Sequence, residues 1–114
     1  YNAFDAHTLV RSDASVPADA RELSVEFIRV AGRRALIRLT VDGVPAGGGE
    51  IPWIMGTISS VGASVGRDMG SPVSREYSDD FPYGGRLREV EIQLLSRQDA
   101  ESLEAEMRSE MSRQ

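Results

Sequence analysis

The sequence contains no cysteine, no lysine and a single histidine, His7, among its 114 residues. Without cysteine the chain forms no disulfide, carries no thiol nucleophile and offers no thiolate ligand to zinc. One histidine is too few for a histidine-based metal site. A Ser-His-Asp triad would have to use His7, and no Gly-x-Ser-x-Gly motif accompanies it. The sequence therefore predicts that this chain does not catalyse a reaction on its own.

Acidic residues outnumber basic ones, so the net charge is −5 and the pI about 4.8. An acidic surface repels phosphate, and we therefore expect no nucleic-acid partner. No apolar run approaches the roughly 20 residues that span a bilayer, and the first residues lack the basic and apolar regions of a signal peptide. We expect no membrane partner, and the sequence leaves the cellular compartment open.

Alternation of apolar and polar residues predicts several short strands. Leu23, Val25 and Phe27 share one face, after which the pattern moves to Ile28 and Val30, as a bulge at Phe27-Ile28 would explain. The Asp42-Gly43 pair predicts a tight hairpin turn. Further strands are expected at 7–12, 34–41, 49–53, 60–65 and 89–94.

A helical pattern replaces the alternation after Leu95. Ser96 is expected to be the N-cap, with Asp99 completing a capping box. Apolar residues then recur at helical spacing, at Ala100, Leu103, Met107 and Met111. We predict a mainly β fold, a jelly-roll-like (laminin-G- or concanavalin-like) antiparallel β-sandwich over residues 1–95 with a C-terminal amphipathic α-helix over 96–114.

The most distinctive stretch is a predicted loop at 66–85 that is rich in glycine, proline and aromatic residues. In one interpretation it is a structured connection, in which glycines take positive φ, Arg67 and Asp68 bridge backbone groups, and aromatic residues seal the core. In the other it contacts a ligand or another domain. Its carboxylates show no EF-hand spacing, so no metal ligand is predicted. The candidate contacting residues are Trp53, Arg67, Asp68, Tyr77 and Tyr83.

Three motifs in order along the chain resemble a known family. The first motif is similar to the C-terminal region of bacterial arylsulfatases. It consists of Val65-Gly66-Arg67-Asp68-Met69-Gly70-Ser71-Pro72-Val73-Ser74, followed by Tyr77, Phe81 and Leu87-x-x-Val90-x-Ile92. The second motif resembles the segment that begins this region in the family. It consists of Tyr1-Asn2-x-Phe4, leading to Val10-x-Ser12-Asp13 and Val16-Pro17. Leu39-x-Val41-Asp42-Gly43 with Gly47–Gly49 resembles its hairpin. The resemblance covers roughly residues 1–95.

The resemblance implies a parent that hydrolyses sulfuric esters. Family members use a formylglycine made within a Cys/Ser-x-Pro-x-Arg motif, usually beside calcium, in a larger upstream domain. Ser71-Pro72-Val73-Ser74-Arg75 lacks the residue required between serine and proline, so no catalytic residue carries over. The short Ala31-Gly32-Arg33 link, the doubled Gly84-Gly85 and the terminal helix depart from the family pattern. We therefore expect a non-catalytic C-terminal accessory domain that carries no cofactor and stabilises, or lines the approach to, the catalytic domain.

Two further expectations concern partners. A carbohydrate- or ligand-binding β-sandwich module is the alternative function, for which Trp53 and Tyr83 are the candidate aromatic residues. If the chain is separated from its catalytic domain, an exposed apolar face could drive self-association. We expect such a homo-oligomer to form through the sandwich face or through the helix stripe of Leu103, Met107 and Met111.

Overall fold

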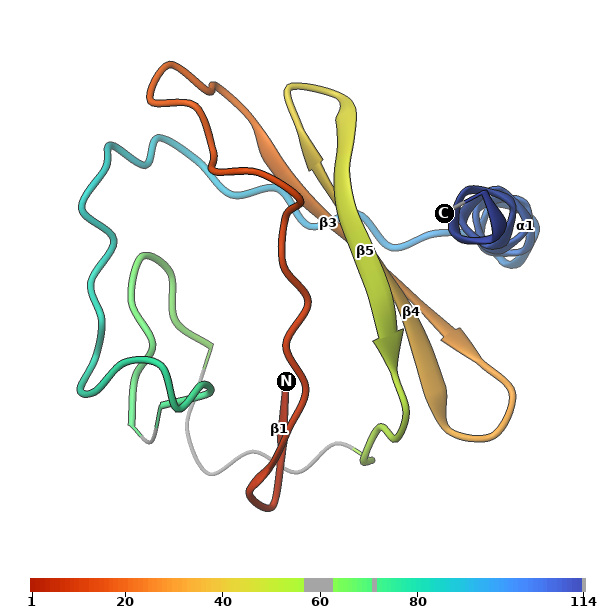
Figure 1. Ribbon diagram of the computed structural model, residues 1–114, viewed down its shortest axis with the longest axis horizontal. Coiled ribbons are helices and arrows are strands. Elements are labelled where there is room, and N and C mark those ends of the chain that lie inside the picture. The colour runs from red at the N-terminus through yellow and green to blue at the C-terminus, as the bar shows by residue number, and fades with distance from the viewer. Residues whose placement is uncertain (57–62, 71, 114) are drawn as a thin grey trace. The chain divides into compact units, whose positions relative to one another are not determined.

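A computed structural model describes residues 1–56, 63–70 and 72–113 (Figure 1). The chain divides into two compact units. The first unit combines Tyr1–Leu9 with Met55–Leu94, and the second combines Val10–Ile54 with Leu95–Gln114. Small antiparallel sheets and one C-terminal helix make up the regular structure, which confirms a β-rich fold with a terminal helix. The jelly-roll sandwich stays a prediction.

The second unit is built on a three-stranded antiparallel sheet in the order β3-β4-β5. β3 spans Leu23–Val30, β4 spans Arg34–Val41 and β5 spans Val44–Ile51. The β3–β4 register runs without interruption from Leu23↔Val41 to Val30↔Arg34, so the predicted bulge is wrong. Phe27 and Ile28 are both apolar because they face opposite sides of the sheet. The irregularity lies instead between Leu39 and Thr40, where β4 pairs with β5.

The turn between β4 and β5 is the predicted Asp42-Gly43 hairpin. Both residues have positive φ, 50° and 78°, as a tight hairpin turn of this kind requires. The carboxylate of Asp42 also accepts the backbone N–H groups of Arg21 and Glu22, each at 2.9 Å. These hydrogen bonds lower the pKa of Asp42 below its ordinary value. The hairpin turn is therefore tied to the start of β3.

β5 begins directly after this turn, so the expected short strand at 49–53 is wrong in position and length. The glycines of β5 do not interrupt the strand. Because they carry no side chain, another segment of the chain can approach the strand closely. A Cβ at Gly47 would lie 3.0 Å from the Ser12 Cα and closer still to the Arg11 carbonyl oxygen. A Cβ at Gly49 would lie 3.2 Å from the side chain of Val10. Residues 10–12 thus pack directly on β5.

Helix α1 (Arg97–Ser112) covers one face of this sheet (Figure 1). Ser96 is the N-cap, as predicted, and its hydroxyl accepts the Asp99 N–H at 3.1 Å. The hydroxyl also donates to the Asp99 carboxylate at 2.6 Å. The apolar stripe of α1 packs on the chain's own sheet. A cluster of Ile28, Leu36 and Met107 is joined by Val30, Ala100, Leu103 and Met111.

Met107 is only 2% exposed in this cluster. The stripe of Leu103, Met107 and Met111 thus packs on the chain's own sheet, and a homo-oligomer formed through it stays a prediction. A second cluster occupies the opposite face of the sheet, where Val10 and Leu39 pack on buried Ala35, Ile37, Ile51 and Ile54.

The first unit holds a small hairpin and a long loop. β1 (Asn2–Ala3) pairs antiparallel with β2 (Ala6–His7). Only His7 of the strand expected at 7–12 lies in a strand. Of the strand expected at 60–65, residues 60–62 fall outside the described residues and residues 63–65 form no strand. Residues 86–95 form no strand, although a strand was expected at 89–94. Alternation of apolar and polar residues does not by itself form a β-ladder. Among the described residues this segment has no strand to which it is hydrogen-bonded.

Candidate functional site

The loop at 66–85 contains no helix or strand among its described residues, as expected. Two backbone hydrogen bonds close it into a compact shape. The Asp68 N–H donates to the Asp80 carbonyl at 2.7 Å, and the Tyr83 N–H donates to the Gly66 carbonyl at 2.6 Å. Gly66 and Gly70 have positive φ of 80° and 85°, which confirms the role predicted for them. Ser71 lies outside the described residues.

Asp68 is the central anchor of this loop. One of its carboxylate oxygens accepts the Val73 N–H at 2.7 Å and also the hydroxyl of Tyr77. The Tyr77 ring stacks on Phe81, with ring centroids 4.6 Å apart. The Tyr77 hydroxyl, followed by the Val73 N–H, lowers the pKa of Asp68, and the same carboxylate raises the pKa of Tyr77. The structured interpretation of Asp68 is therefore correct, since it does bridge a backbone group.

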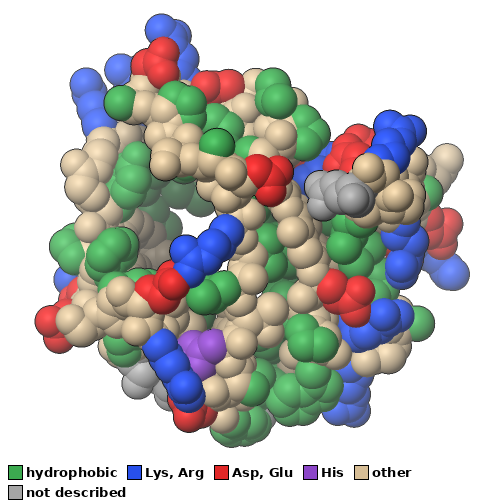
Figure 2. Space-filling view, viewed as in Figure 1, with side chains coloured by type: hydrophobic (Ala, Val, Ile, Leu, Met, Phe, Trp, Pro, Cys, Tyr) green, Lys and Arg blue, Asp and Glu red, His purple; other side chains and the backbone are tan. Residues whose placement is uncertain are grey.

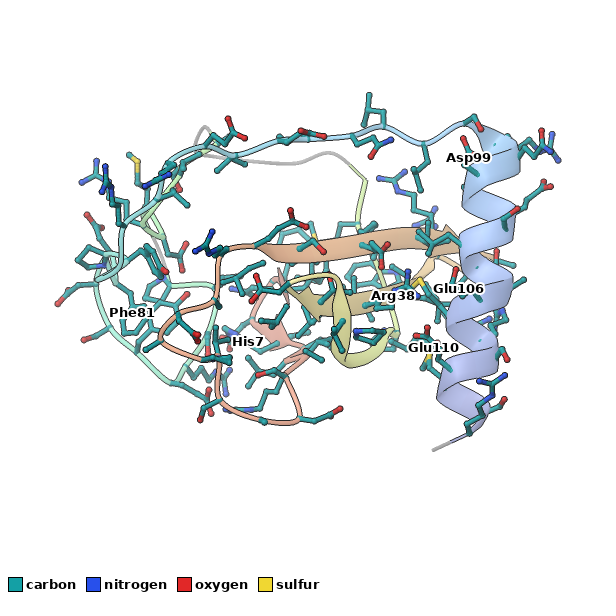
Figure 3. All side chains as sticks on the ribbon, turned by 90° about the horizontal axis from the view of Figure 1, so that it is seen from above. His7, Arg38, Phe81, Asp99, Glu106 and Glu110 are labelled. Carbon is teal, nitrogen blue, oxygen red and sulfur yellow. The ribbon has the colours of Figure 1, made fainter. Side chains whose placement is uncertain are left out.

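His7 connects the β1–β2 hairpin to the same loop. Its Nδ1 lies 2.9 Å from the Val73 carbonyl oxygen and its Nε2 lies 3.3 Å from an Asp5 carboxylate oxygen. Both neighbouring oxygen atoms are hydrogen-bond acceptors. Figure 2 shows the imidazole at the surface, and Figure 3 labels His7 and Phe81 on the two segments.

Arg75 completes the connection between hairpin and loop. Its guanidinium lies 2.8 Å from the Asp5 carboxylate and donates to the Asp5 carbonyl at 3.3 Å. Arg75, and then His7, lower the pKa of Asp5. Sequence reasoning missed this group, because hairpin and loop lie far apart in the chain and neither carries a motif that points to the other.

These residues surround an open hollow of about 500 Å³ in the first unit. The hollow offers the Arg75 guanidinium, the His7 imidazole and the Asp5 carboxylate that lies beside both, which suits hydrogen bonding to a polar group. The Ser74 side chain is occupied, because its hydroxyl accepts the Glu76 N–H at 3.2 Å. The lining residues are Asn2, Asp5, His7, Pro72, Ser74, Arg75 and Tyr77.

The structure separates the residues proposed from the sequence. Arg67 lies 3.5 Å from Asp80 in an exposed ion pair, and so it does not bridge backbone groups through its guanidinium. Tyr83 is held by its backbone and its ring is exposed. Phe81 is exposed as well, so the aromatic residues of the loop do not seal a core. Trp53 is exposed and belongs to the second unit.

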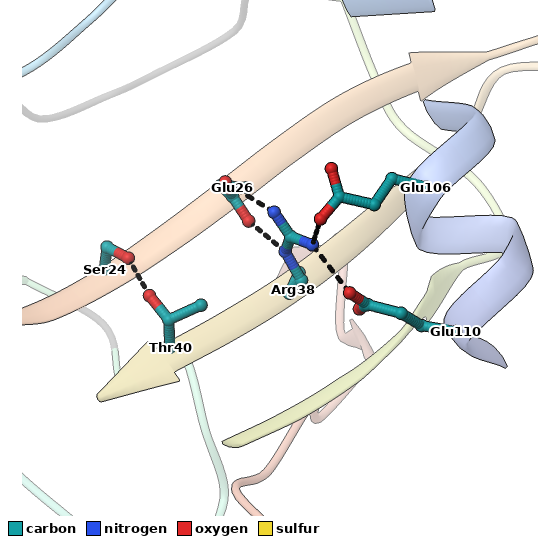
Figure 4. A network of polar contacts seen from close by, with 6 residues as sticks. All are labelled: Ser24, Glu26, Arg38, Thr40, Glu106 and Glu110. Atoms are coloured by element: carbon teal, nitrogen blue, oxygen red, sulfur yellow. Dashed lines mark hydrogen bonds and ion pairs between the residues drawn. The ribbon is translucent and has the colours of Figure 1, made fainter. Parts of the chain in front are cut away.

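A second polar cluster lies in the second unit, around Arg38 of β4 (Figure 4). Its side chain is 12% exposed and forms ion pairs with three glutamates, one on β3 and two on α1. The hydrogen bonds to Glu26 are the largest influence on Arg38 and raise its pKa further above the usual range. The glutamates on α1 are Glu106 at 2.7 Å and Glu110 at 2.9 Å.

This cluster joins sheet and helix (Figure 3). Since every charge in it meets an opposite charge, we assign it a structural role. Within the described ranges, no group of three or more His, Cys, Asp or Glu residues is placed to hold a metal ion. No helix in the described part of the chain is long and apolar enough to cross a membrane.

Comparison of the chain with protein-family models, with curated proteins and with solved structures found no match. The resemblance to arylsulfatase C-terminal domains is therefore supported only by the sequence motifs described above.

Proposed function

We propose that this chain is a non-catalytic accessory domain of a larger, arylsulfatase-like hydrolase, and that its 66–85 loop lines the approach to the partner's catalytic site. The observation that carries this proposal is the anchoring of the loop by Asp68. A loop without helix or strand is held through the Val73 N–H and the Tyr77 hydroxyl. Long ordered loops on a rigid framework commonly carry binding function.

The anchored loop presents cationic and aromatic side chains to solvent. Arg67 and Arg75 keep more than half of their side chains exposed despite their ion pairs. Phe81 and Tyr83 are exposed beside them in the sequence. An aryl sulfate is an anion attached to an aromatic ring, so arginine and aromatic groups match both parts of it. In this proposal the chain binds and orients, while the bond-breaking residues and any calcium belong to the upstream domain.

A jelly-roll sandwich is the architecture that we propose for the chain when it is seated against that domain. The three-stranded antiparallel sheet of the second unit and the short β1–β2 hairpin of the first unit support this arrangement. In such an arrangement the strands would form two layers, with the connecting loops gathered at the ends.

Steady-state kinetics on the longer gene product that contains this chain tests the proposal. Asp68→Asn weakens the anchor, and Arg75→Gln removes a cation from the hollow. We expect both variants to raise KM for an aryl sulfate severalfold and to leave kcat nearly unchanged, because they affect binding only. Arg97→Gln, which breaks an exposed pair with Glu101 on α1, is the matched control and should change neither constant. An unchanged KM in both loop variants would contradict the proposed role of the loop in substrate binding.

A carbohydrate-binding module is the second candidate, and the exposure of Trp53 and Tyr83 favours it. Flat aromatic rings that face solvent can stack on sugar rings. This candidate predicts a saturable change in Trp53 fluorescence when a glycan is titrated into the isolated chain. A flat titration across a glycan panel would reject it.

A further inference from the structure

Met69 lies in the closed loop of the first unit, on the turn that precedes the tyrosine anchor. The Asp68 N–H, which donates to the Asp80 carbonyl at 2.7 Å, ties this turn to the far side of the loop. Arg67 and Met69 are two positions apart on the turn, and the Arg67 Nη2 donates to the Met69 sulfur at 3.7 Å. The turn therefore holds a thioether beside a guanidinium.

Met69 is the most exposed of the chain's four methionines, all of which lie among the described residues. It is 40% exposed, whereas Met107 is 2% exposed. Met55 and Met111 fall between these two. A dissolved oxidant must reach the sulfur atom, so exposure sets the order in which methionines react. Met69 is thus the methionine most open to oxidation.

The other contact of the Arg67 guanidinium is weak. Its Nη1 lies 3.5 Å from the Asp80 carboxylate, and both side chains are about half exposed. An exposed ion pair of this kind contributes little to stability. A thioether sulfur is also a weak hydrogen-bond acceptor. The guanidinium can therefore turn toward a stronger acceptor on the same turn at little cost.

We propose that Met69 is an oxidation site, and that the oxygen of its sulfoxide captures the Arg67 guanidinium. A peroxide supplies this oxygen. The sulfur lone pair attacks one peroxide oxygen, the O–O bond breaks, and the other oxygen leaves as hydroxide, which takes the proton of the first and becomes water. The sulfur is oxidised by two electrons and the peroxide is reduced. Methionine sulfoxide is polar and is reduced back by sulfoxide reductases, so the change is reversible.

The new acceptor forms where the cation already is. The sulfoxide oxygen is bonded to the sulfur that Arg67 approaches, so the guanidinium reaches it without a large movement. Hydrogen bonds from a charged donor are shorter and stronger than neutral ones. The oxidised loop then offers less of the Arg67 charge to an anionic ligand. This last consequence rests on the proposed function, whereas the oxidation and the capture of Arg67 do not.

Peptide mapping by mass spectrometry, after brief treatment of the 114-residue chain with dilute hydrogen peroxide, tests the site. We expect Met69 to be oxidised about tenfold faster than Met107 or more, because buried sulfur reacts only when the structure opens. Met55 and Met111 should react at intermediate rates. Equal initial rates at Met69 and Met107 would overturn the proposal, and so would a Met69 that reacts no faster than Met111.

NMR of the arginine side chains tests the capture of Arg67. Oxidation should shift the Arg67 Nε–H signal and slow its exchange with water. Arg97, which forms an exposed pair with Glu101 on α1, is the control and should not change. In Met69→Leu the same peroxide treatment should leave the Arg67 signal in place. Met69→Gln, which carries an amide oxygen near the position of the sulfoxide oxygen, should shift the signal without peroxide.

Two NMR results would contradict the capture of Arg67. One is an unchanged Arg67 signal after complete oxidation of Met69, and the other is an equal shift in peroxide-treated Met69→Leu. Neither measurement uses a sulfate ester, so a negative result would leave the accessory-domain proposal untouched. Thermal unfolding of the oxidised chain and of both variants verifies that the loop is compared in folded protein.

Discussion

Arg38 on β4 and Glu106 on α1 form an ion pair with 2.7 Å between guanidinium nitrogen and carboxylate oxygen. The same guanidinium nitrogen donates to Glu110 one turn further along the helix. Arg38 also forms a two-pronged pair with Glu26 on the neighbouring strand. One side chain thus joins two strands and the helix, beside the apolar contact made by Met107.

Replacing Arg38 by Met should destabilise the second unit. The substitution keeps most of the apolar stem but leaves three carboxylates near one another without a cation. We expect a loss of about 2 kcal/mol in the free energy of unfolding, below the full cost of a buried pair because the glutamates are partly exposed. Urea unfolding measures it. Arg108→Met, which breaks an exposed pair with Glu104, should stay within about 0.5 kcal/mol; equal losses in both variants would contradict the role of Arg38.

Met107→Ala should lower the free energy of unfolding more than Arg38→Met or Arg108→Met. The side chain fills the space between α1 and the sheet and is almost completely buried. Removing it leaves a cavity, which typically costs about 2–5 kcal/mol. Met111, which is only partly buried in the same cluster, gives the comparison, and Met111→Ala should cost clearly less. If calorimetry finds the same change in unfolding temperature for both, the helix does not pack as described.

Gly47→Ala tests the approach of residues 10–12 to β5. The new methyl group would overlap the Arg11 carbonyl oxygen, so backbone must move. We expect a loss of at least about 1–3 kcal/mol, as for an overpacked core. Gly84→Ala provides the matched control, because a Cβ there meets no atom within 4 Å. Thermal unfolding of the two variants should show a lowered midpoint only for Gly47→Ala.

The anchor of the 66–85 loop should depend on pH in a defined direction. The pKa of Asp68 is lowered in the folded chain, so the anchor is fully effective above the ordinary aspartate pKa of about 4 and is lost as pH falls through the lowered value. An NMR titration of Asp68 measures that pKa. Tyr77→Phe removes the largest cause, and the pKa should move up toward its ordinary range. Tyr83→Phe should leave it unchanged, and an identical pKa in the unmodified chain and Tyr77→Phe would refute the hydrogen bond.

The sequence was most informative where structure is local. The Asp42-Gly43 turn, the two alternating strands β3 and β4, and the Ser96 cap all depend on neighbouring residues, and each was predicted correctly apart from the bulge expected in β3. The glycines of β5 misled the prediction, because glycine weakens a strand unless another backbone approaches it. That approach, by residues 10–12, is a tertiary contact that no local pattern reveals.

The candidate site shows the same contrast between local structure, which the sequence predicts, and contacts between distant segments, which it does not. One of the two interpretations of the 66–85 loop predicted Asp68 as a bridging residue, and its carboxylate does accept the Val73 N–H. The links from His7 to Val73 and from Arg75 to Asp5 were not predicted, since they join distant segments. Arg38 was missed for the same reason, because its glutamates come from β3 and α1 and the sequence does not reveal that the three elements meet.

Hydrolysis of an aryl sulfate is the most direct test of the accessory-domain proposal. The assay compares the isolated 114-residue chain with the arylsulfatase-like protein that is proposed to contain it, both with calcium present. The proposal predicts activity in the longer protein and none in the isolated chain. Turnover by the isolated chain would contradict the argument that it lacks a catalytic group, and absence of turnover in both would contradict the link to a sulfatase.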